Sequence, residues 1–410
     1  MICSLVVTLW ALFALAFTVV AIGATRQLFT RARAATRRVR SWPHIALVRP
    51  CEGLDPSLAE TLRSSATAKY DGPRTIFFCV PSAADPAYAV LARVRDELVA
   101  GGADVRLVVT AIETRANRKA AQLAVVDAHL PDDAPVLVIA DSDVMLDDES
   151  LPSLLGALVD ERHAGAASAP PIDVSAATTG DRWSAALLSS TPHALLALAG
   201  LSERSGGVPL LAGALLAVRR EALAAVGGFR SLEPYLGEDF ELARRLHDAG
   251  LAMATSAAPA RFTDSGRSVK GVVRRYARWS LVVRRQRPAL FCTYVLLLGC
   301  TPLVAAAALM LAAFSADRAA IALGSATGLV IARTVLALTL RRCYGIGGGW
   351  ARALGAMLAG ELLVCAGATQ AGASAEVEWR GRRFYVGHRG ALMPLGVESL
   401  APEALAPEAP

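Results

Sequence analysis

Two aspartates, Asp141 and Asp143, directly follow the apolar run Val136–Ala140. If this run is a strand, its side chains alternate between the two faces, so both carboxylates point the same way. Carboxylates placed in this manner bind a hard divalent cation such as Mg²⁺ or Mn²⁺, and the same ion accepts diphosphate oxygens. An isolated Asp-x-Asp is more often a solvated turn, but its place at a strand end predicts a metal site.

A second acidic pair, Glu238 and Asp239, follows a glycine-rich loop and opens an expected helix, Phe240–Ala249. One interpretation is an acidic cap, because the N–H groups at a helix start favour negative charge. A carboxylate held at such a junction can also act as a base toward a hydroxyl within hydrogen-bond distance. We favour Asp239 as the base and Glu238 as the alternative base. Glu238 is also a candidate contact for the acceptor, the molecule that carries this hydroxyl.

Basic and aromatic residues share one face of the expected helix Val269–Arg285. Arg275, Arg278 and Trp279 stand at positions i, i+3 and i+4, which are neighbours on a helix. Arginine forks grip phosphate oxygens, and an adjacent indole can wall off the ligand. Alternatively, these residues anchor a helix at a membrane surface. Lys119, near the start of an earlier expected helix, either meets the same diphosphate or is a surface cation.

The elements that must position these residues alternate between β-rich and helical patterns from residue 42 to residue 287. This alternation predicts an α/β fold with a mostly parallel sheet, in which ligands bind at the carboxyl ends of strands. The candidate strands are His44–Arg49, Thr75–Val80, Val105–Val109, Val136–Ala140 and Leu215–Val218. The candidate helices include Pro86–Val99, Asn117–His129, Ser150–Val159, Trp183–Ala199, Glu238–Ala249 and Val269–Arg285.

Apolar residues make up 54% of the 410 residues and are concentrated at the two ends of the chain. Ile2–Thr25 carries no charge and has the length, about 20 residues, that a membrane-spanning helix needs. We therefore expect an N-terminal transmembrane anchor at residues 1–25 and a basic juxtamembrane linker at residues 26–41, where the arginines follow. The positive-inside rule then places the α/β domain, residues 42–287, in the cytoplasm.

The apolar runs after the α/β domain predict further membrane helices. Residues 288–340 are typical of a transmembrane helical hairpin, with Asp317 and Arg318 at its outer turn. Arg333 lies within the second arm, where it either snorkels or faces protein, and a functional role is the minority interpretation.

The last apolar segment, residues 351–375, contains Glu361 and is followed by several arginines. Because a crossing here would place those arginines outside, we expect an interfacial or re-entrant helix. Residues 376–396 are expected to form a basic cytoplasmic segment, and residues 397–410, rich in Ala, Pro and Glu, a disordered tail.

Charge and cysteine content restrict the cellular compartment and the classes of partner that we expect. The net charge of +6 comes mainly from arginines that lie beside apolar runs, which favours membrane anchoring and argues against nucleic acid as a partner. The seven cysteines are odd in number and lack CxxC spacing, so neither a zinc site nor a disulfide framework is expected. We therefore expect a multi-pass protein of the cell membrane whose α/β domain faces the reducing cytoplasm.

Taken in order, these stretches resemble the ceramide glucosyltransferase family, a branch of the GT-A glycosyltransferases that also includes the hopanoid-associated enzymes. The resemblance covers about residues 40–290 and the flanking spans. The stretches that carry it are Val48–Asp55, Ala116–Lys119, Asp141–Asp143, Gly237–Phe240, Arg275–Trp279 as a (Q/R)xxRW pattern, and Trp379–Arg382. The resemblance implies a GT-A domain with N-terminal and C-terminal transmembrane helices.

This resemblance also implies an inverting enzyme that moves a hexose, glucose or N-acetylglucosamine, from a UDP-sugar to a lipid hydroxyl of ceramide or a hopanoid. A divalent cation on Asp143 would hold the diphosphate, with Asp141 on the metal or the ribose. Asp239 would deprotonate the lipid hydroxyl. The other donor contacts that the resemblance implies are Lys119, Arg275, Arg278 and Trp279.

One position departs from the family pattern. The family usually places an aspartate for the nucleotide just after the second strand, but here the stretch Cys79–Pro86 has Ser82 at that position. Asp85 either substitutes for that aspartate or matches a different one. The departure bears on nucleotide affinity and donor preference. His193 resembles a family histidine near the acceptor, or is a surface histidine.

Two other functions are compatible with the sequence. A processive polysaccharide synthase shares these motifs, but it needs a helix bundle that conducts the chain, and three clear spans are visible here. A non-catalytic membrane scaffold that retains the fold is compatible with Ser82.

Overall fold

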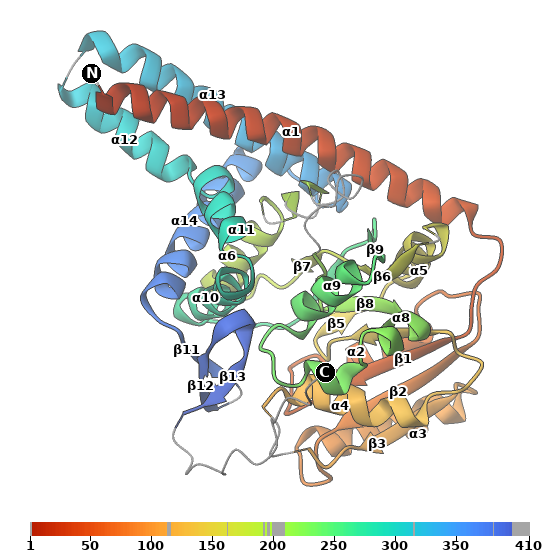
Figure 1. The fold of residues 1–410 in the computed structure, drawn as a ribbon. Coiled ribbons are helices and arrows are strands. Elements are labelled where there is room, and N and C mark those ends of the chain that lie inside the picture. Colours follow the sequence, from red (N-terminus) through yellow and green to blue (C-terminus); the bar gives the residue numbers. More distant parts are fainter. Residues whose placement is uncertain are drawn as a thin grey trace.

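The apolar runs of the α/β segment form the strands that their composition predicts. The computed structural model describes residues 2–112, 116–161, 163–191, 193–194, 197–198, 210–314, 316–379 and 381–395. The α/β domain lies beside long helices that extend away from it (Figure 1). Each of the five strands expected from the sequence is present, and none of their boundaries differs by more than one residue.

The central sheet contains seven strands, which are β1 (Ile45–Pro50), β2 (Arg74–Val80), β3 (Val105–Val109), β4 (Val136–Ala140), β6 (Ala164–Ser168), β8 (Leu215–Arg219) and β9 (Ala252–Thr255). Their order is β3-β2-β1-β4-β8-β6-β9. The pairs β3-β2, β2-β1, β1-β4 and β6-β9 are parallel, whereas β8 is antiparallel to both of its neighbours. The expected α/β fold with a mostly parallel sheet is therefore confirmed.

Both faces of this sheet are covered. Alternate residues of β1 belong to two separate hydrophobic cores, with Ile45 and Leu47 in one and Ala46 and Val48 in the other. Side chains buried on both faces produce a continuous apolar run instead of an alternating one. This is why β1 and β4 were readable from the sequence.

Strands made of small residues, or of very few residues, escaped the sequence patterns. β6 reads Ala-Gly-Ala-Ala-Ser, without the β-branched and aromatic residues that mark strands. A second sheet has the order β5-β10-β7 and consists of β5 (Val144–Met145), β7 (Pro171–Asp173) and β10 (Ala260–Phe262). Because β10 is antiparallel to β5, the loop after β10 lies next to Asp143, which directly precedes β5.

The helices of the α/β domain are α2 (Leu58–Thr67), α3 (Ala87–Ala100), α4 (Arg118–Val126), α5 (Ser150–Asp160), α6 (Thr179–Leu188), α8 (Arg220–Ala225), α9 (Glu238–Asp248) and α10 (Val269–Gln286). α4 begins after Asn117, whose Oδ1 accepts the N–H of Ala120 at 3.0 Å. α6 ends at Leu188, earlier than the sequence predicted, and part of the segment up to Ala199 lies outside the described residues.

One helix, α1 (Ile2–Arg38), covers the expected anchor and most of the expected linker. It has no break at Thr25, because arginine is a good helix former and the basic end is held by α5. Arg38 Nε and Nη2 donate to the two carboxylate oxygens of Asp160 at 2.7 and 2.6 Å. Most of the expected basic juxtamembrane segment is thus the helical end of α1, docked on α5.

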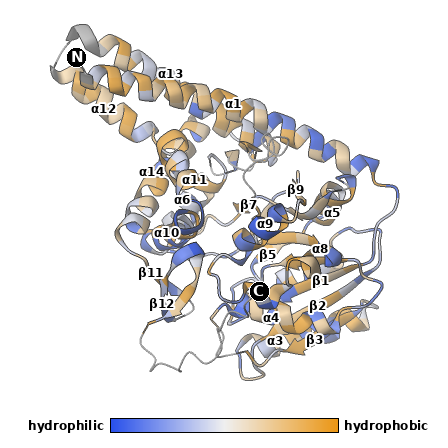
Figure 2. Ribbon diagram, in the orientation of Figure 1, coloured by the Kyte–Doolittle hydropathy of each residue, from blue (hydrophilic) through white to orange (hydrophobic). Residues whose placement is uncertain are grey.

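The C-terminal apolar helices are α11 (Pro288–Thr293), α12 (Thr301–Phe314), α13 (Ala316–Cys343) and α14 (Trp350–Ala373), with a π-helical turn at Tyr294–Leu298. Among the described residues, three helices are long and apolar enough to cross a membrane, Cys3–Arg38, Ala320–Cys343 and Trp350–Ala373. A further pair, Pro288–Leu298 and Thr301–Ala313, is bent by 52°. Figure 2 shows apolar residues along α12, α13 and the N-terminal part of α1.

α14 packs along the α/β domain on one side. A Cβ on Gly360 would lie 2.7 Å from Ser190 Oγ, and one on Gly367 would lie 3.2 Å from Tyr276, so these glycines allow close packing. On the outer side Leu362 is 47% exposed. α14 therefore presents one face to the domain and one outward, and its expected interfacial or re-entrant placement stays a prediction.

A small antiparallel sheet follows α14 and consists of β11 (Glu376–Trp379), β12 (Arg382–Val386) and β13 (Leu392–Pro394). It is bonded to the loop that precedes α9. Leu236 N–H donates to Gly390 O at 2.9 Å, and Leu392 N–H donates to Pro234 O at 2.7 Å. The segment after the last apolar helix is therefore attached to the α/β domain next to the acidic start of α9.

A fully buried arginine in β1 fixes the turn that follows β4. Arg49 Nη1 donates to the carbonyl oxygens of Asp141 and Val144 at 2.9 and 2.7 Å, and Nη2 donates to Thr61 O at 2.9 Å. Burial lowers the pKa of Arg49 to about 10, so it stays charged at neutral pH. Arg49 thereby sets the position of Asp143 within this turn.

We expect Arg49→Met to destabilise the protein, because each buried carbonyl oxygen left without its donor costs about 1–3 kcal/mol. The measurement is the thermal unfolding midpoint of the detergent-purified protein. Arg93→Met, at an exposed position of α3, is the matched control and should leave the midpoint unchanged. Equal midpoints for the two variants would show that Arg49 does not hold the turn.

Candidate active site

A cavity of about 680 Å³ lies at the edge of the central sheet where β1 and β4 end and β8 begins. It gathers side chains that are far apart in the sequence. Of the residues singled out from the sequence, those that line it are Lys119, Asp141, Asp143, His193, Glu238, Asp239, Arg275, Arg278 and Trp279. The cavity therefore lies where ligands bind in open α/β sheets, outside the carboxyl ends of parallel strands.

Lys119 lies between the two acidic pairs. Its Nζ is 2.6 Å from Asp141 Oδ1 and 3.3 Å from Glu238 Oε1, and it donates to Gly213 O at 2.9 Å. Burial alone would lower the pKa of Lys119, but Asp141 and Glu238 raise it above its usual value. Lys119 is therefore charged and links Asp141, which follows β4, to Glu238 at the start of α9. A surface cation would not make both contacts.

Asp143 lies among other acids in the cavity. Burial, followed by the charge of Asp141, raises the pKa of Asp143 to about 7, while Arg275 acts in the opposite direction. Thr263 N–H donates to the backbone oxygen of Asp143 at 2.9 Å, which brings Asp264 into the same cavity. A carboxylate whose charge is this disfavoured fits a divalent cation, because the ion supplies the opposing charge.

The set of protein ligands for such an ion is small. Among the described residues, no group of three or more His, Cys, Asp or Glu side chains is arranged to hold a metal. Mg²⁺ commonly binds through one or two carboxylates together with substrate phosphates and water. Asp143 and Asp141 would hold Mg²⁺ or Mn²⁺ in this way, with a diphosphate completing the shell.

Asp239 is fixed by backbone hydrogen bonds. Its Oδ2 accepts the N–H of Gly213 at 2.8 Å, and its Oδ1 accepts the N–H of Phe240 at 2.8 Å. A Cβ on Gly213 would lie 2.9 Å from Oδ2, so glycine leaves the room that this contact needs. Burial, followed by the charge of Glu238, raises the pKa of Asp239 to about 6. A pKa close to neutral suits a general base.

Glu238 is engaged by other side chains. Its Oε2 accepts from Asn117 Nδ2 at 3.0 Å, and its Oε1 lies near Lys119. Asn117 Nδ2 also donates to Tyr235 O at 2.8 Å, so it ties the start of α4 to the loop before α9. These contacts hold the Glu238 side chain in place and favour Asp239 as the base.

Arg275 is held between two aromatic rings. Its guanidinium carbon is 4.5 Å from the centre of the Phe262 ring and 4.9 Å from that of Trp279. Its Nη1 is 3.9 Å from Asp173 Oδ1. Stacking of this kind keeps the guanidinium edge available for other groups. The predicted helix face of Arg275, Arg278 and Trp279 does line the cavity.

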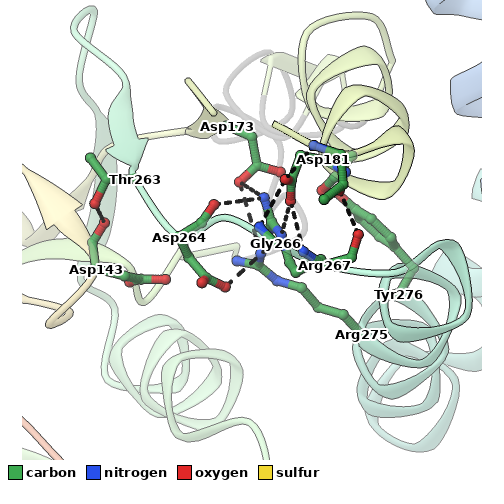
Figure 3. A network of polar contacts seen from close by, with 11 residues as sticks. Asp143, Asp173, Asp181, Thr263, Asp264, Gly266, Arg267, Arg275 and Tyr276 are labelled. Atoms are coloured by element: carbon green, nitrogen blue, oxygen red, sulfur yellow. Dashed lines mark hydrogen bonds and ion pairs between the residues drawn. The ribbon is translucent and has the colours of Figure 1, made fainter. Parts of the chain in front are cut away.

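A second arginine anchors the loop that carries Asp264. Arg267 is 3.0 Å from both Asp173 and Asp181, and Asp181 Oδ2 also accepts the N–H of Gly266 at 2.9 Å. Figure 3 shows Asp264 between Asp143 and these arginines. The network fixes the loop after β10 against the start of α6, and thus fixes one wall of the cavity.

His193 is buried, with 4% of its surface exposed, and lines the cavity. Its ring meets that of Tyr344 edge-on, with centres 5.4 Å apart. Burial lowers the pKa of His193 to about 4, so the imidazole is neutral. Its Nε2 has no hydrogen-bond partner among the described residues. It is therefore not a surface histidine.

Ser82 and Asp85 are not among the residues that line the cavity, in contrast to the sequence-based assignment. Asp85 Oδ1 accepts the N–H groups of Gly53 and Ala87 at 2.9 and 2.8 Å. Ser82 Oγ accepts a backbone N–H within its own turn. The bond from Gly53 to Asp85 fixes the loop after β1. This loop reaches the cavity through Glu52.

Several cavity residues were given no individual role in the sequence analysis, and they include Glu52, Asp55, Arg118, Gly213 and Asp264. Arg118 forms an ion pair with Glu52, and Asp55 accepts the hydroxyl of Ser142, which stands between the two strand-end aspartates. Glu52 and Asp55 follow a recognised strand, so their position was a usable signal. Asp264 follows a three-residue strand that no pattern revealed.

The family of the chain follows from its sequence as a whole. Glycosyl transferase family 21 matches residues 6–392, nearly the full length. The chain belongs to this family. This family 21 member is therefore a glycosyltransferase with a GT-A α/β fold, and the resemblance carried by its motifs is confirmed. No curated protein matches the chain.

Solved structures resemble this family 21 member at low sequence identity. A mannosyltransferase from Pyrobaculum calidifontis, solved with GDP-Man and Mn²⁺, is 17% identical, with 88% of this chain and 98% of that chain covered and a TM-score of 0.44. Glucosyl-3-phosphoglycerate synthase from Mycobacterium tuberculosis, solved with Mg²⁺ and UDP, is 17% identical, with 61% of this chain and 82% of that chain covered and a TM-score of 0.35.

We expect Asp143→Ala to abolish the metal-dependent part of UDP binding, because Asp143 is the expected protein ligand of the ion. The measurement is calorimetric titration of UDP with Mn²⁺ and again with a chelator. Asp148→Ala, beyond the turn and outside the cavity, is the matched control and should bind as the wild type does. If Mn²⁺ strengthens UDP binding equally in Asp143→Ala, the metal assignment is wrong.

Proposed function

We propose that this family 21 member is a membrane-bound, inverting hexosyltransferase. It moves glucose or N-acetylglucosamine from a UDP-sugar to a lipid hydroxyl such as that of ceramide or a hopanoid. The observation that carries the proposal is the composition of one cavity. Asp143, Asp239 and Arg275 line it together with Phe291 and Tyr294, which belong to the apolar segment after the α/β domain.

The donor is proposed to bind at the strand-end side of the cavity. Asp143 and Asp141 would hold the divalent cation and the diphosphate, and a bound Mg²⁺ or Mn²⁺ stabilises the charge that grows on the leaving group. Arg275 and Arg278 supply further positive charge to the same phosphates. Trp279 walls off the sugar or the nucleotide. Lys119 acts on this site through Asp141, to which it is bonded.

The acceptor hydroxyl is proposed to lie near Asp239. This carboxylate takes the hydroxyl proton while the hydroxyl oxygen bonds to the anomeric carbon from the face opposite the diphosphate. The bond between that carbon and the phosphate oxygen breaks, and its electron pair leaves with UDP. A single displacement of this kind inverts the anomeric centre and gives a β-linkage. His193 and Glu238 are the proposed polar contacts for the acceptor.

The acceptor is proposed to reach the cavity from the bilayer. Apolar side chains from the α/β domain and from the membrane segment share its wall, among them Leu187, Leu188, Phe291 and Val364. A lipid can keep its hydrocarbon in this apolar part while its hydroxyl meets the acids. We place the protein in the cell membrane as a multi-pass protein with the α/β domain in the cytoplasm, because arginines cluster where the apolar helices meet that domain.

We expect Asp239→Asn to abolish sugar transfer while UDP binding stays close to that of the wild type. The amide keeps the shape of the side chain but cannot take a proton. The measurements are product formation from a radiolabelled UDP-sugar and calorimetric binding of UDP. Wild-type turnover in this variant would remove Asp239 from its role as the base.

The pH dependence of transfer tests the same residue. A base works in its ionised form, and burial has raised the pKa of Asp239 to about 6. We therefore expect transfer to fall as the pH drops through about 6, above the value of about 3.9 for an ordinary aspartate. The measurement is kcat/KM for the acceptor between about pH 4 and 8. If kcat/KM fell only around the pKa of an ordinary aspartate, the assignment would be contradicted.

The overall proposal is tested by the lipids that the enzyme makes. Cells that express the wild type should accumulate a lipid that carries one hexose, detected by mass spectrometry, and cells that express Asp239→Asn should not. A long polymer in place of this lipid would instead identify a processive synthase. The absence of any product with UDP-sugars, Mn²⁺ and candidate lipids would favour a non-catalytic scaffold.

A further inference from the structure

A buried ion pair joins two apolar helices outside the active site. Arg333 of α13 and Glu361 of α14 are 1% and 0% exposed, and Arg333 Nη2 and Nε lie 2.6 and 2.7 Å from Glu361 Oε1. Arg333 precedes Arg341 by eight residues, which is about 12 Å along a helix. Charges at such a depth are costly and are retained where they have a function.

This pair also binds the break in the first C-terminal span. Glu361 accepts the N–H of Thr301 at 2.8 Å and its hydroxyl at 3.1 Å, and Thr301 is the first residue of α12. The N–H groups at a helix start have no partner within the helix. Glu361 therefore caps α12 at the point where the chain bends by 52°.

The other side of the break is satisfied as well. Trp10 of α1 donates its indole N–H to Leu296 O at 2.7 Å, and Cys365 of α14 donates to Gly299 O at 3.4 Å. A Cβ on Gly299 would lie 2.7 Å from Val364, so the break packs directly on α14. Broken helices persist at membrane depth where neighbouring groups take up the freed backbone in this way.

The bend determines what faces the cavity. The segment before it contributes Phe291 and Tyr294 to the cavity wall, and α14 contributes Val364, three residues after Glu361. Tyr294 packs both on the main core of the α/β domain and on a cluster that includes residues of α1 and α13. Without the bend, the segment Pro288–Leu298 would continue along the axis of α12 and would point in a different direction.

We infer that Arg333 and Glu361 are positioning residues for the acceptor: they hold the bend that places Tyr294 and Phe291 as the wall against which the lipid acceptor lies. This inference rests on the proposed transfer to a lipid. The pair acts on the acceptor side of the cavity only. The donor side is held by Arg49, Lys119 and the loop after β10, which belong to the α/β domain.

The test separates acceptor use from donor binding. In the double variant Arg333→Met/Glu361→Met both charges are replaced together, and such replacements of a buried pair commonly leave a protein folded. Methionine cannot cap Thr301. We expect an unfolding midpoint near that of the wild type, unchanged calorimetric binding of UDP with Mn²⁺, and a fall of about 100-fold in kcat/KM for the lipid, the cost of misplacing a bound substrate.

The assay uses UDP-glucose and UDP-N-acetylglucosamine with ceramide or a hopanoid alcohol in detergent micelles, whichever pair the wild type converts. Leu362→Ala, next to Glu361 on the outer face of α14, is the matched control and should transfer as the wild type does. Tyr294→Ala leaves the ion pair in place and should show the same selective loss, which keeps the test decisive if the double variant does not fold.

The outcomes are distinct. Wild-type transfer in the double variant, or in Tyr294→Ala, overturns the inference and leaves the proposed function standing. Loss of UDP binding together with transfer also overturns it, because the pair would then support the whole fold and not the acceptor wall. A wild type that transfers sugar to neither lipid overturns the proposed function, and the inference with it.

Discussion

The charge of Lys119 holds the active site together. Carboxylates gathered in a partly buried cavity repel one another and lose hydration, so their ionised forms are disfavoured. Lys119 binds one acid from each pair, Asp141 after β4 and Glu238 at the start of α9. The other member of each pair, Asp143 and Asp239, has a raised pKa. One cation thus contacts both acidic pairs and fixes their geometry.

The two sides of the cavity are built by different forces. On the donor side, buried backbone groups and charges fix the loops, as Arg49 does for the turn after β4 and Arg267 for the loop after β10. On the acceptor side, apolar helices pack closely and one buried ion pair fixes a bend. This division fits the proposed function, in which one substrate comes from water and the other from a bilayer.

Where the sequence predicted correctly, the signal was local. β1 and β4 are continuous apolar runs because both of their faces are buried, and α10 shows its Arg275, Arg278 and Trp279 face through helical spacing. Ser82 and Asp85 were assigned to the nucleotide from a motif position, and neither lines the cavity. Asp85 Oδ1 instead accepts the N–H groups of Gly53 and Ala87. Asp264 was missed because its strand is too short to show a pattern.

The sequence by itself determined the α/β fold, the family and the identity of many polar residues in the cavity, because these depend on composition and on spacing along the chain. Tertiary structure decided which acid pairs with Lys119, that Glu238 is engaged by Asn117, and that Arg333 meets Glu361 at the bend. Such pairings depend on distances between segments that are remote in the chain, and those distances exist only once the sheet and the helices have packed.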